Sequence, residues 1–360
     1  MTALLLSICA ILVPSAEIKA EATGCECAYL PEDTVISSRI LDLFFGSKGS
    51  GESKEETDSG LELTVGGEVF GIRIKENCVT VVDKGETDGI ENGDKIISID
   101  GESIKEIKDV TRALEEFEGG DISVTVKRGE ETKTVELKPE RVGDGYKIGL
   151  AIRDGAAGIG TITYYDPKTG CFGGLGHGIC DKDSSLPIEM TSGLVTGVIL
   201  GGVQKGAQGK PGELCGVLTK EVLGTLEINS ECGVFGTIEE SVLGSLDTLP
   251  IASKDEVKEG PAKIVSTVKN GRTDEYSVRI YDINHSSDGT KSFKVEVTDN
   301  ALIALTGGIV RGMSGSPIIQ DGKLVGAVTH VMVADPTEGY GIFIENMLNA
   351  ANNQSQQKAA

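Results

Sequence analysis

Several chemistries are excluded by what this chain of 360 residues lacks. It has no tryptophan, few aromatic residues (4%), only three histidines, and no C-x-x-C or H-E-x-x-H motif. Without paired ligands at metal-binding spacing we expect no metal site, and no organic cofactor is implied. Basic residues are also few: there are 34 of them against 56 acidic residues, which gives a formal net charge of −22. Phosphate backbones would repel such a chain, so we expect no nucleic-acid partner.

The residues that are abundant indicate a folded, mainly β protein. Glycine occurs 49 times, hydrophobic residues make up 39% and charged residues 25% of the chain. A chain of this length exceeds what one core usually serves, so we expect two domains. From Gly145 to Ile344 short apolar stretches alternate with turn residues, which predicts a β-sandwich or barrel. Within that region Asp321-Gly322 predicts a tight hairpin turn.

The N-terminal region is predicted to lie outside the folded domains. The apolar run Ala3–Val13 is shorter than the about 20 residues of a membrane span, so residues 1–20 are interpreted as an export signal or short membrane anchor, although no basic residue precedes the run. Residues 21–60 are interpreted as a linker or pro-region, since their last part contains only small and charged residues. At the other end, a short helix is expected from Glu345 and a disordered tail over 349–360.

An amphipathic helix and a hairpin are predicted between residues 107 and 137. Four apolar residues are spaced so that they lie on one face of a helix: Ile107, Val110, Leu114 and Phe117. The preceding segment GIENGDKIISIDGESI (89–104), with this helix and hairpin, resembles a PDZ domain, an α+β fold that captures an extended peptide by strand addition. The resemblance implies a PDZ-like domain over residues 61–140. It also implies a peptide groove lined by Gly71, Ile72, Val110 and Leu114.

The sharpest motif for chemistry is Gly312-Met313-Ser314-Gly315-Ser316-Pro317. A nucleophilic serine needs backbone amides aimed at the oxygen that becomes negative in the tetrahedral intermediate. Flanking glycines let the chain bend so that the N–H groups of Gly312 and Ser314 form this oxyanion hole. The pattern is similar to the nucleophile loop of trypsin-like proteases, with Ser316 in place of the usual glycine. The alternative interpretation is a structural Gly/Ser turn at the start of a hairpin.

A serine nucleophile needs a base, and three histidines are the candidates. In a trypsin-like double barrel the base comes from the first half and the serine from the second. His177 fits this arrangement, His330 is the alternative, and His285 is interpreted as a surface residue. Asp299 is slightly favoured as the acid that orients the base, with Asp181 and Asp183 as competitors.

Two cysteines, Cys171 and Cys180, bracket the proposed base. An exported protein could join them by a disulfide that fixes the loop of His177, and two buried thiols are the equally supported alternative.

A more specific resemblance covers nearly the whole chain. A PDZ-like module ahead of the protease, the GLGHGI segment and the run TGGIVRGMSGSPIIQDGKLVGAVTHVMVADPTEGYGIFIE resemble the SpoIVB peptidases of endospore-forming bacteria. The resemblance implies a mainly β protein with a trypsin-like double β-barrel over residues 145–348. It also implies a catalytic His177, Asp299 and Ser314.

The same resemblance implies a biological role. Such a peptidase is exported into the space between the two membranes around the forespore, cleaves itself, and then cleaves a membrane-anchored regulator of an intramembrane protease. Membrane association through the N-terminal segment would suit that role. Two other functions remain open: a quality-control protease of the HtrA type, whose usual domain order is the reverse, and a non-catalytic PDZ scaffold.

Overall fold

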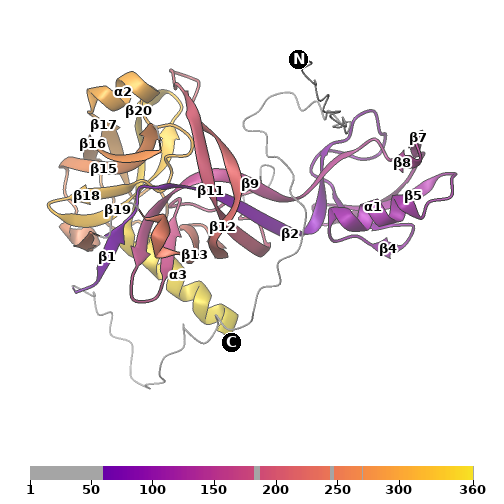
Figure 1. The fold of residues 1–360 in the computed structure, drawn as a ribbon, viewed down its shortest axis with the longest axis horizontal. Helices are drawn as coiled ribbons and strands as arrows, with labels where there is room; N and C mark the ends of the chain where they lie inside the picture. The colour runs from indigo at the N-terminus through magenta and orange to yellow at the C-terminus, as the bar shows by residue number, and fades with distance from the viewer. Residues whose placement is uncertain (1–59, 182–186, 244–246, 270, 360) are drawn as a thin grey trace, which may run out of the picture.

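The computed structural model describes residues 60–181, 187–243, 247–269 and 271–359. It is mainly β, as predicted, with two β-barrels and a smaller PDZ-like α+β domain (Figure 1). The predicted export segment (1–20) and almost all of the predicted linker (21–60) lie outside the described residues. Within the described ranges, no helix combines the length and apolar character needed to cross a membrane.

The first barrel is closed by pairing between β2 and β9. Its strands follow the order β9-β10-β13-β12-β11-β2, and β1 and β14 continue the sheet beyond β9. The core includes Phe70, Ile162 and Phe172, all at most 1% exposed. The strands are β1 (Glu62–Val65), β2 (Val69–Asp83), β9 (Ala151–Asp166), β10 (Cys171–Gly174), β11 (Met190–Gln204), β12 (Glu213–Ser230), β13 (Gly233–Ile238) and β14 (Thr248–Pro250).

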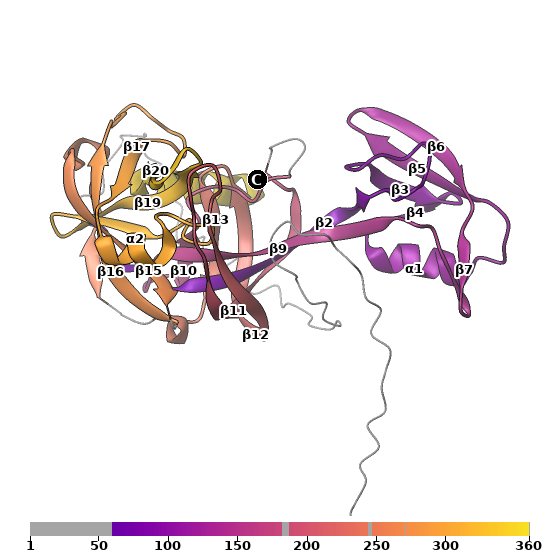
Figure 2. The same ribbon diagram turned by 90° about the horizontal axis from the view of Figure 1, so that it is seen from above.

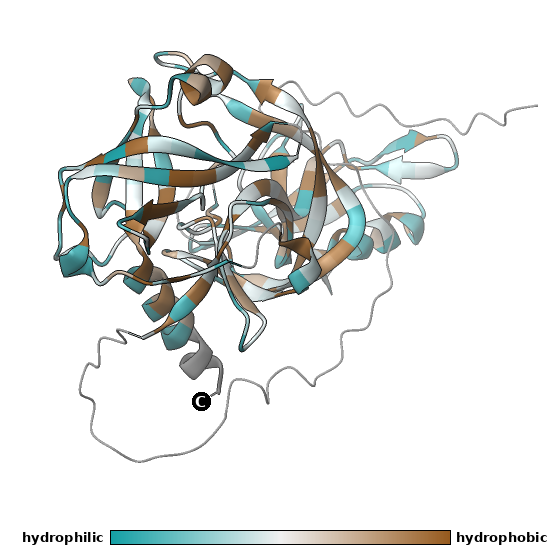
Figure 3. Ribbon diagram, turned by 60° about the vertical axis from the view of Figure 1, so that its left-hand side comes forward, coloured by the Kyte–Doolittle hydropathy of each residue, from teal (hydrophilic) through white to brown (hydrophobic). Residues whose placement is uncertain are grey.

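The second barrel has six strands in the closed order β15-β16-β17-β20-β19-β18. Alternate residues of β16 (Tyr276, Val278 and Ile280) point into its core, as a half-buried strand requires. Figure 3 shows hydrophobic stretches along the strands and hydrophilic colour at many turns. The strands are β15 (Gly260–Lys269), β16 (Arg272–Tyr281), β17 (Phe293–Val297), β18 (Pro317–Gln320), β19 (Lys323–Met332) and β20 (Asp335–Phe343).

The predicted hairpin turn of the second barrel is confirmed. Asp321 and Gly322 connect β18 to β19, and both have positive φ values, 51° and 77°. Two consecutive residues with positive φ make a turn whose twist matches that of the flanking strands, and Asp-Gly is a preferred pair for it.

The PDZ-like domain contains the predicted helix and hairpin. Helix α1 (Ile107–Glu115) covers a sheet in which Ile122, Val124 and Val126 are fully buried. Its capping box links Glu106 and Asp109, which satisfies amides of the first turn. The strands are β3 (Lys95–Ile99), β4 (Glu102–Ser103), β5 (Ile122–Arg128), β6 (Glu131–Leu137), β7 (Glu140–Val142) and β8 (Gly145–Lys147).

The boundary between the PDZ-like domain and the first barrel differs from the prediction of 61–140. Strand β1 and the first half of β2 pair with barrel strands, because β9 and β11 bond to β2 on its two sides. Beyond Val79, β2 enters the PDZ-like sheet, and β9 returns from that sheet to the barrel. Figure 2 shows these two strands bridging the two bodies. The PDZ-like domain is therefore inserted between two neighbouring strands of the first barrel.

The predicted disordered tail over 349–360 is helical as far as Ala359. Helix α3 (Ile344–Ala359) continues because no glycine or proline interrupts it and because Leu348, Ala350 and Ala351 pack against the cluster around Met347. Three shorter helical elements complete the described chain: α2 (Asn300–Thr306), η2 (Glu240–Val242) and η3 (Lys254–Glu256).

Candidate active site

Ser314 lies on the tight loop that leads into β18, between glycines with left-handed backbone angles. Gly312 has φ 95° and Gly315 has φ 96°, values that disfavour other residues. A side chain at Gly315 would also collide with the first barrel, since its Cβ would lie 2.0 Å from the carbonyl oxygen of Thr161. The Ser314 hydroxyl donates to the carbonyl of Thr329 at 2.7 Å. The nucleophile is thus held against β19 rather than hydrogen-bonded to a histidine.

The two amides predicted to form the oxyanion hole make no hydrogen bonds to other parts of the loop. Met313, Gly315 and Ser316 donate their amides to backbone carbonyls. Among the described residues, the amides of Gly312 and Ser314 donate to no acceptor. Gly312 and Ser314 are both partly exposed, so their neighbouring amides, which have no protein acceptor, form an accessible site for an oxyanion.

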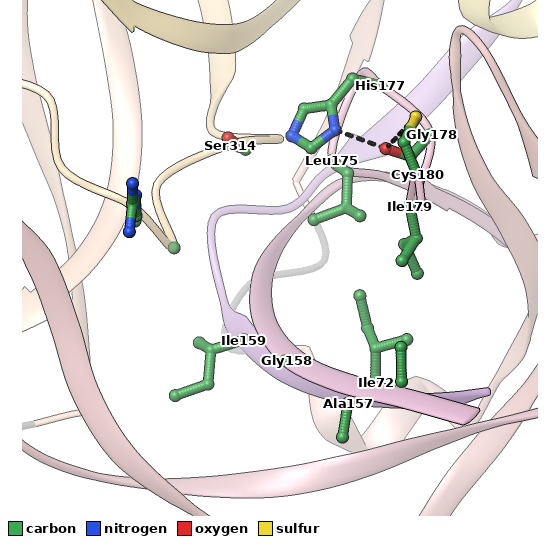
Figure 4. A pocket seen from close by; sticks show the side chains of 13 residues that line it. Ile72, Ala157, Gly158, Ile159, Leu175, His177, Gly178, Ile179, Cys180 and Ser314 are labelled. Atoms are coloured by element: carbon green, nitrogen blue, oxygen red, sulfur yellow. Dashed lines mark hydrogen bonds between the residues drawn. The ribbon is translucent and has the colours of Figure 1, made fainter. Parts of the chain in front are cut away.

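His177 follows β10 through a turn of two residues with positive φ. Leu175 (φ 64°) and Gly176 (φ 68°) reverse the chain, and the Leu175 amide donates to Thr161 at 3.2 Å. Leucine is strained in this conformation, so the surrounding contacts must hold it there. The turn places the imidazole beside Ser314 (Figure 4).

The imidazole is in the protonation state that a base requires. Its Nδ1 lies 2.9 Å from the carbonyl oxygen of Gly178. A carbonyl only accepts, so Nδ1 carries the proton and the opposite nitrogen, Nε2, keeps its lone pair. Burial lowers the pKa of His177 from its ordinary value of 6.5, opposed by the bond to Gly178. His177 is therefore neutral at pH 7.

The alternative base, His330, belongs to the same cluster. Its ring centroid lies 4.9 Å from that of His177. Burial lowers the pKa of His330 to about 4, and so does repulsion from Lys291 and from His177 when that ring is protonated. Its Nδ1 is buried without a hydrogen bond in the described part of the chain. His285 lies elsewhere and is exposed, with its Nδ1 2.8 Å from the Lys254 carbonyl.

The structure does not bring Asp299 together with His177. One carboxylate oxygen accepts the amides of Ala301 (2.9 Å) and Leu302 (3.0 Å), which caps the N-terminus of α2. The other accepts the Ser277 amide at 3.4 Å. Of the two competing acids, Asp181 forms an ion pair with Arg153 at 3.1 Å, and Asp183 lies outside the described residues.

A pocket of about 330 Å³ opens beside the serine and the histidine (Figure 4). Its walls are mainly apolar and come from β2, β9 and the loop that carries His177. Arg311 is the charged side chain among the lining residues, and it is exposed with no carboxylate partner in the described ranges. The lining residues are Ile72, Ala156, Ala157, Gly158, Ile159, Leu175, His177, Gly178, Ile179, Cys180, Arg311, Gly312 and Ser314.

The two cysteines that bracket His177 are both free thiols. Cys180 is exposed, whereas Cys171 is partly buried at the start of β10. Burial raises the pKa of both thiols above the ordinary value of 9.0. Both are therefore weak nucleophiles at neutral pH, and a disulfide does not fix the base loop.

The four residues predicted to line a PDZ groove are not brought together. Gly71 pairs with Ile159 and Thr196 inside the first barrel, and Ile72 lines the pocket beside Ser314. Val110 is only 3% exposed within the PDZ-like core, and Leu114 packs against that core.

Helix α1 contacts β8 and β9, and Glu106 at its N-cap forms an ion pair with Lys75 of β2 at 3.3 Å. The amide of Ile107, at the start of α1, donates to the Asp154 carboxylate of β9 at 3.0 Å. The groove prediction failed because residues 69–83 form one continuous strand, β2, whose first half pairs with β9 and β11 of the barrel.

Backbone groups that the sequence could not identify complete the site. The carbonyl of Gly178 sets the tautomer of His177, and the carbonyl of Thr329 holds the Ser314 hydroxyl. Carbonyls are present at every residue, so no motif marks those that matter. Thr161 also contacts the nucleophile loop, but a lone threonine in a β-strand carries no functional signal.

One family model matches more than half of the chain. The model of the family "SpoIVB peptidase S55" matches residues 144–348, and a PDZ model matches 79–128. No curated protein matches the chain. Among solved structures, the active form of the Rv3671c protease from M. tuberculosis is 11% identical and covers 55% of this chain and 74% of its own, with a TM-score of 0.32. Its inactive form is 10% identical, covers 54% and 83%, and has a TM-score of 0.31.

Proposed function

The chain belongs to the SpoIVB peptidase S55 family and is a serine peptidase with a PDZ domain, and we propose that it acts in a sporulation signalling cascade. In this proposal it cleaves itself and then a membrane-associated regulatory protein, whose loss allows intramembrane processing of a transcription-factor precursor. It acts outside the cytoplasmic membrane, in the space between the two membranes of the forespore. Family membership and the apolar N-terminal run support the proposal.

The observation that carries the catalytic part is the meeting of Ser314 and His177 at one pocket, next to two unoccupied amides. Rotation of the Ser314 hydroxyl away from Thr329 would bring it to Nε2 of His177, which takes its proton as the oxygen attacks the peptide carbonyl. The carbonyl oxygen becomes negative and is stabilised by the amides of Gly312 and Ser314. The imidazolium then donates its proton to the leaving amine, and water hydrolyses the acyl-enzyme.

The pocket also indicates a preference in the substrate. Its isoleucine, leucine and alanine side chains suit an aliphatic residue next to the scissile bond. Arg311 carries an uncompensated positive charge on a strongly acidic protein. An acidic residue in the substrate would therefore be favoured at the rim of the pocket.

Self-processing of the purified chain tests the proposal. Wild type and Ser314→Ala are incubated and followed by intact mass. We expect fragments from wild type alone, with the new termini locating the cleaved bond. Intact wild type that also fails to react with a fluorophosphonate probe at Ser314 would refute the catalytic proposal.

A second assay separates the signalling role from general quality control. Unfolded casein is offered beside a membrane-anchored peptide that contains the self-cleavage sequence. Restricted cleavage of the peptide is the expected result, and broad degradation of casein would favour the HtrA-type function.

A further inference from the structure

One residue of the first barrel bonds to both catalytic loops. Thr161, near the end of β9, donates its amide to the Ser314 carbonyl at 3.0 Å and its hydroxyl to the Gly312 carbonyl at 2.8 Å. Its own carbonyl accepts the amide of Leu175 at 3.2 Å, two residues before His177. Thr161 is fully buried. It therefore sits between the loop of the base and the loop of the nucleophile.

The two carbonyls that Thr161 holds belong to the two residues of the oxyanion hole. Gly312 and Ser314 each keep their N–H without an acceptor while their C=O is bonded to Thr161. Gly312 is the weaker point, because glycine rotates freely and its φ of 95° lies in a region that only glycine adopts readily. The Thr161 hydroxyl is the side-chain donor to this carbonyl among the described residues. The Gly312 carbonyl belongs to the peptide unit between Gly312 and Met313, whereas the Gly312 N–H belongs to the preceding unit. Removing the donor therefore loosens the ψ angle of Gly312, which sets how these two peptide units are aligned.

We infer that Thr161 is a positioning residue, which fixes the oxyanion hole through the carbonyls of Gly312 and Ser314 without touching the substrate. This inference rests on the proposed acyl transfer at Ser314. Thr163, two residues after Thr161, also bonds to the loop of Ser314, because its hydroxyl donates to the Gly315 carbonyl at 2.8 Å. The hydroxyl of Thr161 thus contributes to kcat through geometry, and it makes no contribution to substrate binding.

The test compares two isosteric Thr→Val substitutions in the first barrel. Thr161→Val removes the donor to Gly312, whereas Thr196→Val is a matched control. Thr196 is 2% exposed on β11, and its buried hydroxyl oxygen has no hydrogen-bond partner in the described ranges. Both changes keep side-chain volume and shape, and only the first removes a bond to the nucleophile loop.

We expect Thr161→Val to lower kcat by about tenfold to a hundredfold, less than the loss of a whole oxyanion donor, with KM nearly unchanged. A peptide aldehyde, whose bound form carries an oxyanion, should bind it more weakly by a similar factor. A product-like peptide should bind it as tightly as wild type. Thr161→Ser, which retains the hydroxyl, should recover most of kcat, and Thr196→Val should match wild type.

The inference is overturned if Thr161→Val keeps the wild-type kcat and aldehyde affinity, or if Thr196→Val loses as much. If Thr161→Val does not fold, Thr161→Cys takes its place. Its weaker S–H donor should then give a kcat between those of Ser314→Ala and wild type, and a wild-type kcat would count against the role. Fluorophosphonate labelling of wild-type Ser314 is measured first. Absent labelling refutes the proposed function itself, and normal labelling with an unaffected Thr161→Val refutes this inference alone.

Discussion

Replacing Asp299 by asparagine separates the two roles that a carboxylate could have at this position. In the structure it caps helix α2 by accepting the amides of Ala301 and Leu302. Asparagine caps a helix about as well as aspartate, whereas alanine costs about 1 kcal/mol, within a range of roughly 0.5–2. We therefore expect Asp299→Asn to retain kcat within about threefold of wild type, because its fold and its active site are unchanged. Asp299→Ala should lose about 1 kcal/mol of unfolding free energy.

The assay measures kcat, KM and urea unfolding for both variants on one peptide substrate. Ser314→Ala supplies the background rate, and His177→Ala shows what the loss of the base does. The pH dependence of kcat/KM is an additional readout. Its acid limb should stay below the ordinary histidine value of 6.5 in Asp299→Asn, since burial rather than Asp299 sets the pKa of His177.

An orienting acid would behave very differently. Exchange of such an aspartate for asparagine costs about 10⁴ in kcat in a trypsin-like triad, because the base adopts the wrong tautomer. A loss of that order in Asp299→Asn, with unfolding unchanged, would refute the capping role as the function of this residue. It would mean that the active conformation moves Asp299 to His177 and replaces the carbonyl of Gly178.

Three further predictions concern the loop, the histidine cluster and the rim of the pocket. Gly315→Ala should destabilise the fold by on the order of 3 kcal/mol in urea unfolding, because its Cβ would overlap Thr161. Gly322→Ala is the control: Gly322 also has a positive φ, but its Cβ would have nothing within 4 Å, so the substitution should cost only about 1 kcal/mol. Equal losses in the two variants would contradict the argument from close approach. The pKa of His330 lies at about 4, below its ordinary 6.5, so as pH falls between these values the unfolded chain gains a proton that the folded chain does not, and folding weakens. Between about pH 7 and pH 5 this group should remove roughly 1–2 kcal/mol after allowance for solvent screening, and His330→Gln should remove that part of the slope; an unchanged slope would show that His330 is not buried neutral. Arg311→Glu should reduce the preference for a glutamate-containing peptide over its lysine counterpart by roughly threefold to fivefold at low salt, and a preference that does not respond to the substitution would place the charge away from the substrate.

Local chemistry explains which parts of the structure were predictable from sequence. The Asp321-Gly322 turn, helix α1 and the nucleophile loop each depend on residues within a few positions of one another. Glycines at 312 and 315 are needed for backbone angles that few other residues adopt, so the sequence itself marks the bend around Ser314. The closeness of His177 to Ser314 followed from the resemblance to double-barrel proteases rather than from spacing.

Long-range pairing explains what was missed. Residues 69–76 alternate as a strand in either setting, and only their bonds to β9 and β11 decide that they belong to the barrel. An aspartate fifteen residues before the serine is equally compatible with a cap and with an orienting acid, since spacing does not show where the carboxylate points. The tail was predicted to be disordered from its polar composition, although the packing of Leu348 and Ala351 on the barrels extends α3.

Because the PDZ domain is inserted between β2 and β9, the first barrel and the PDZ domain share these two strands. Neighbouring antiparallel strands lie about 5 Å apart, so a domain whose ends are close together fits at their connection without opening the barrel. The strand that returns, β9, pairs with the PDZ-like sheet at Ile152, lines the pocket at Ala156–Ile159, and bonds the nucleophile loop at Thr161. A shift of β9 along its axis would break the bonds to Gly312 and Ser314 together with its ladder bonds to β2 and β10. The geometry of the oxyanion hole is therefore tied to the register of the strand that carries the PDZ domain, which a PDZ domain joined by a flexible linker could not achieve.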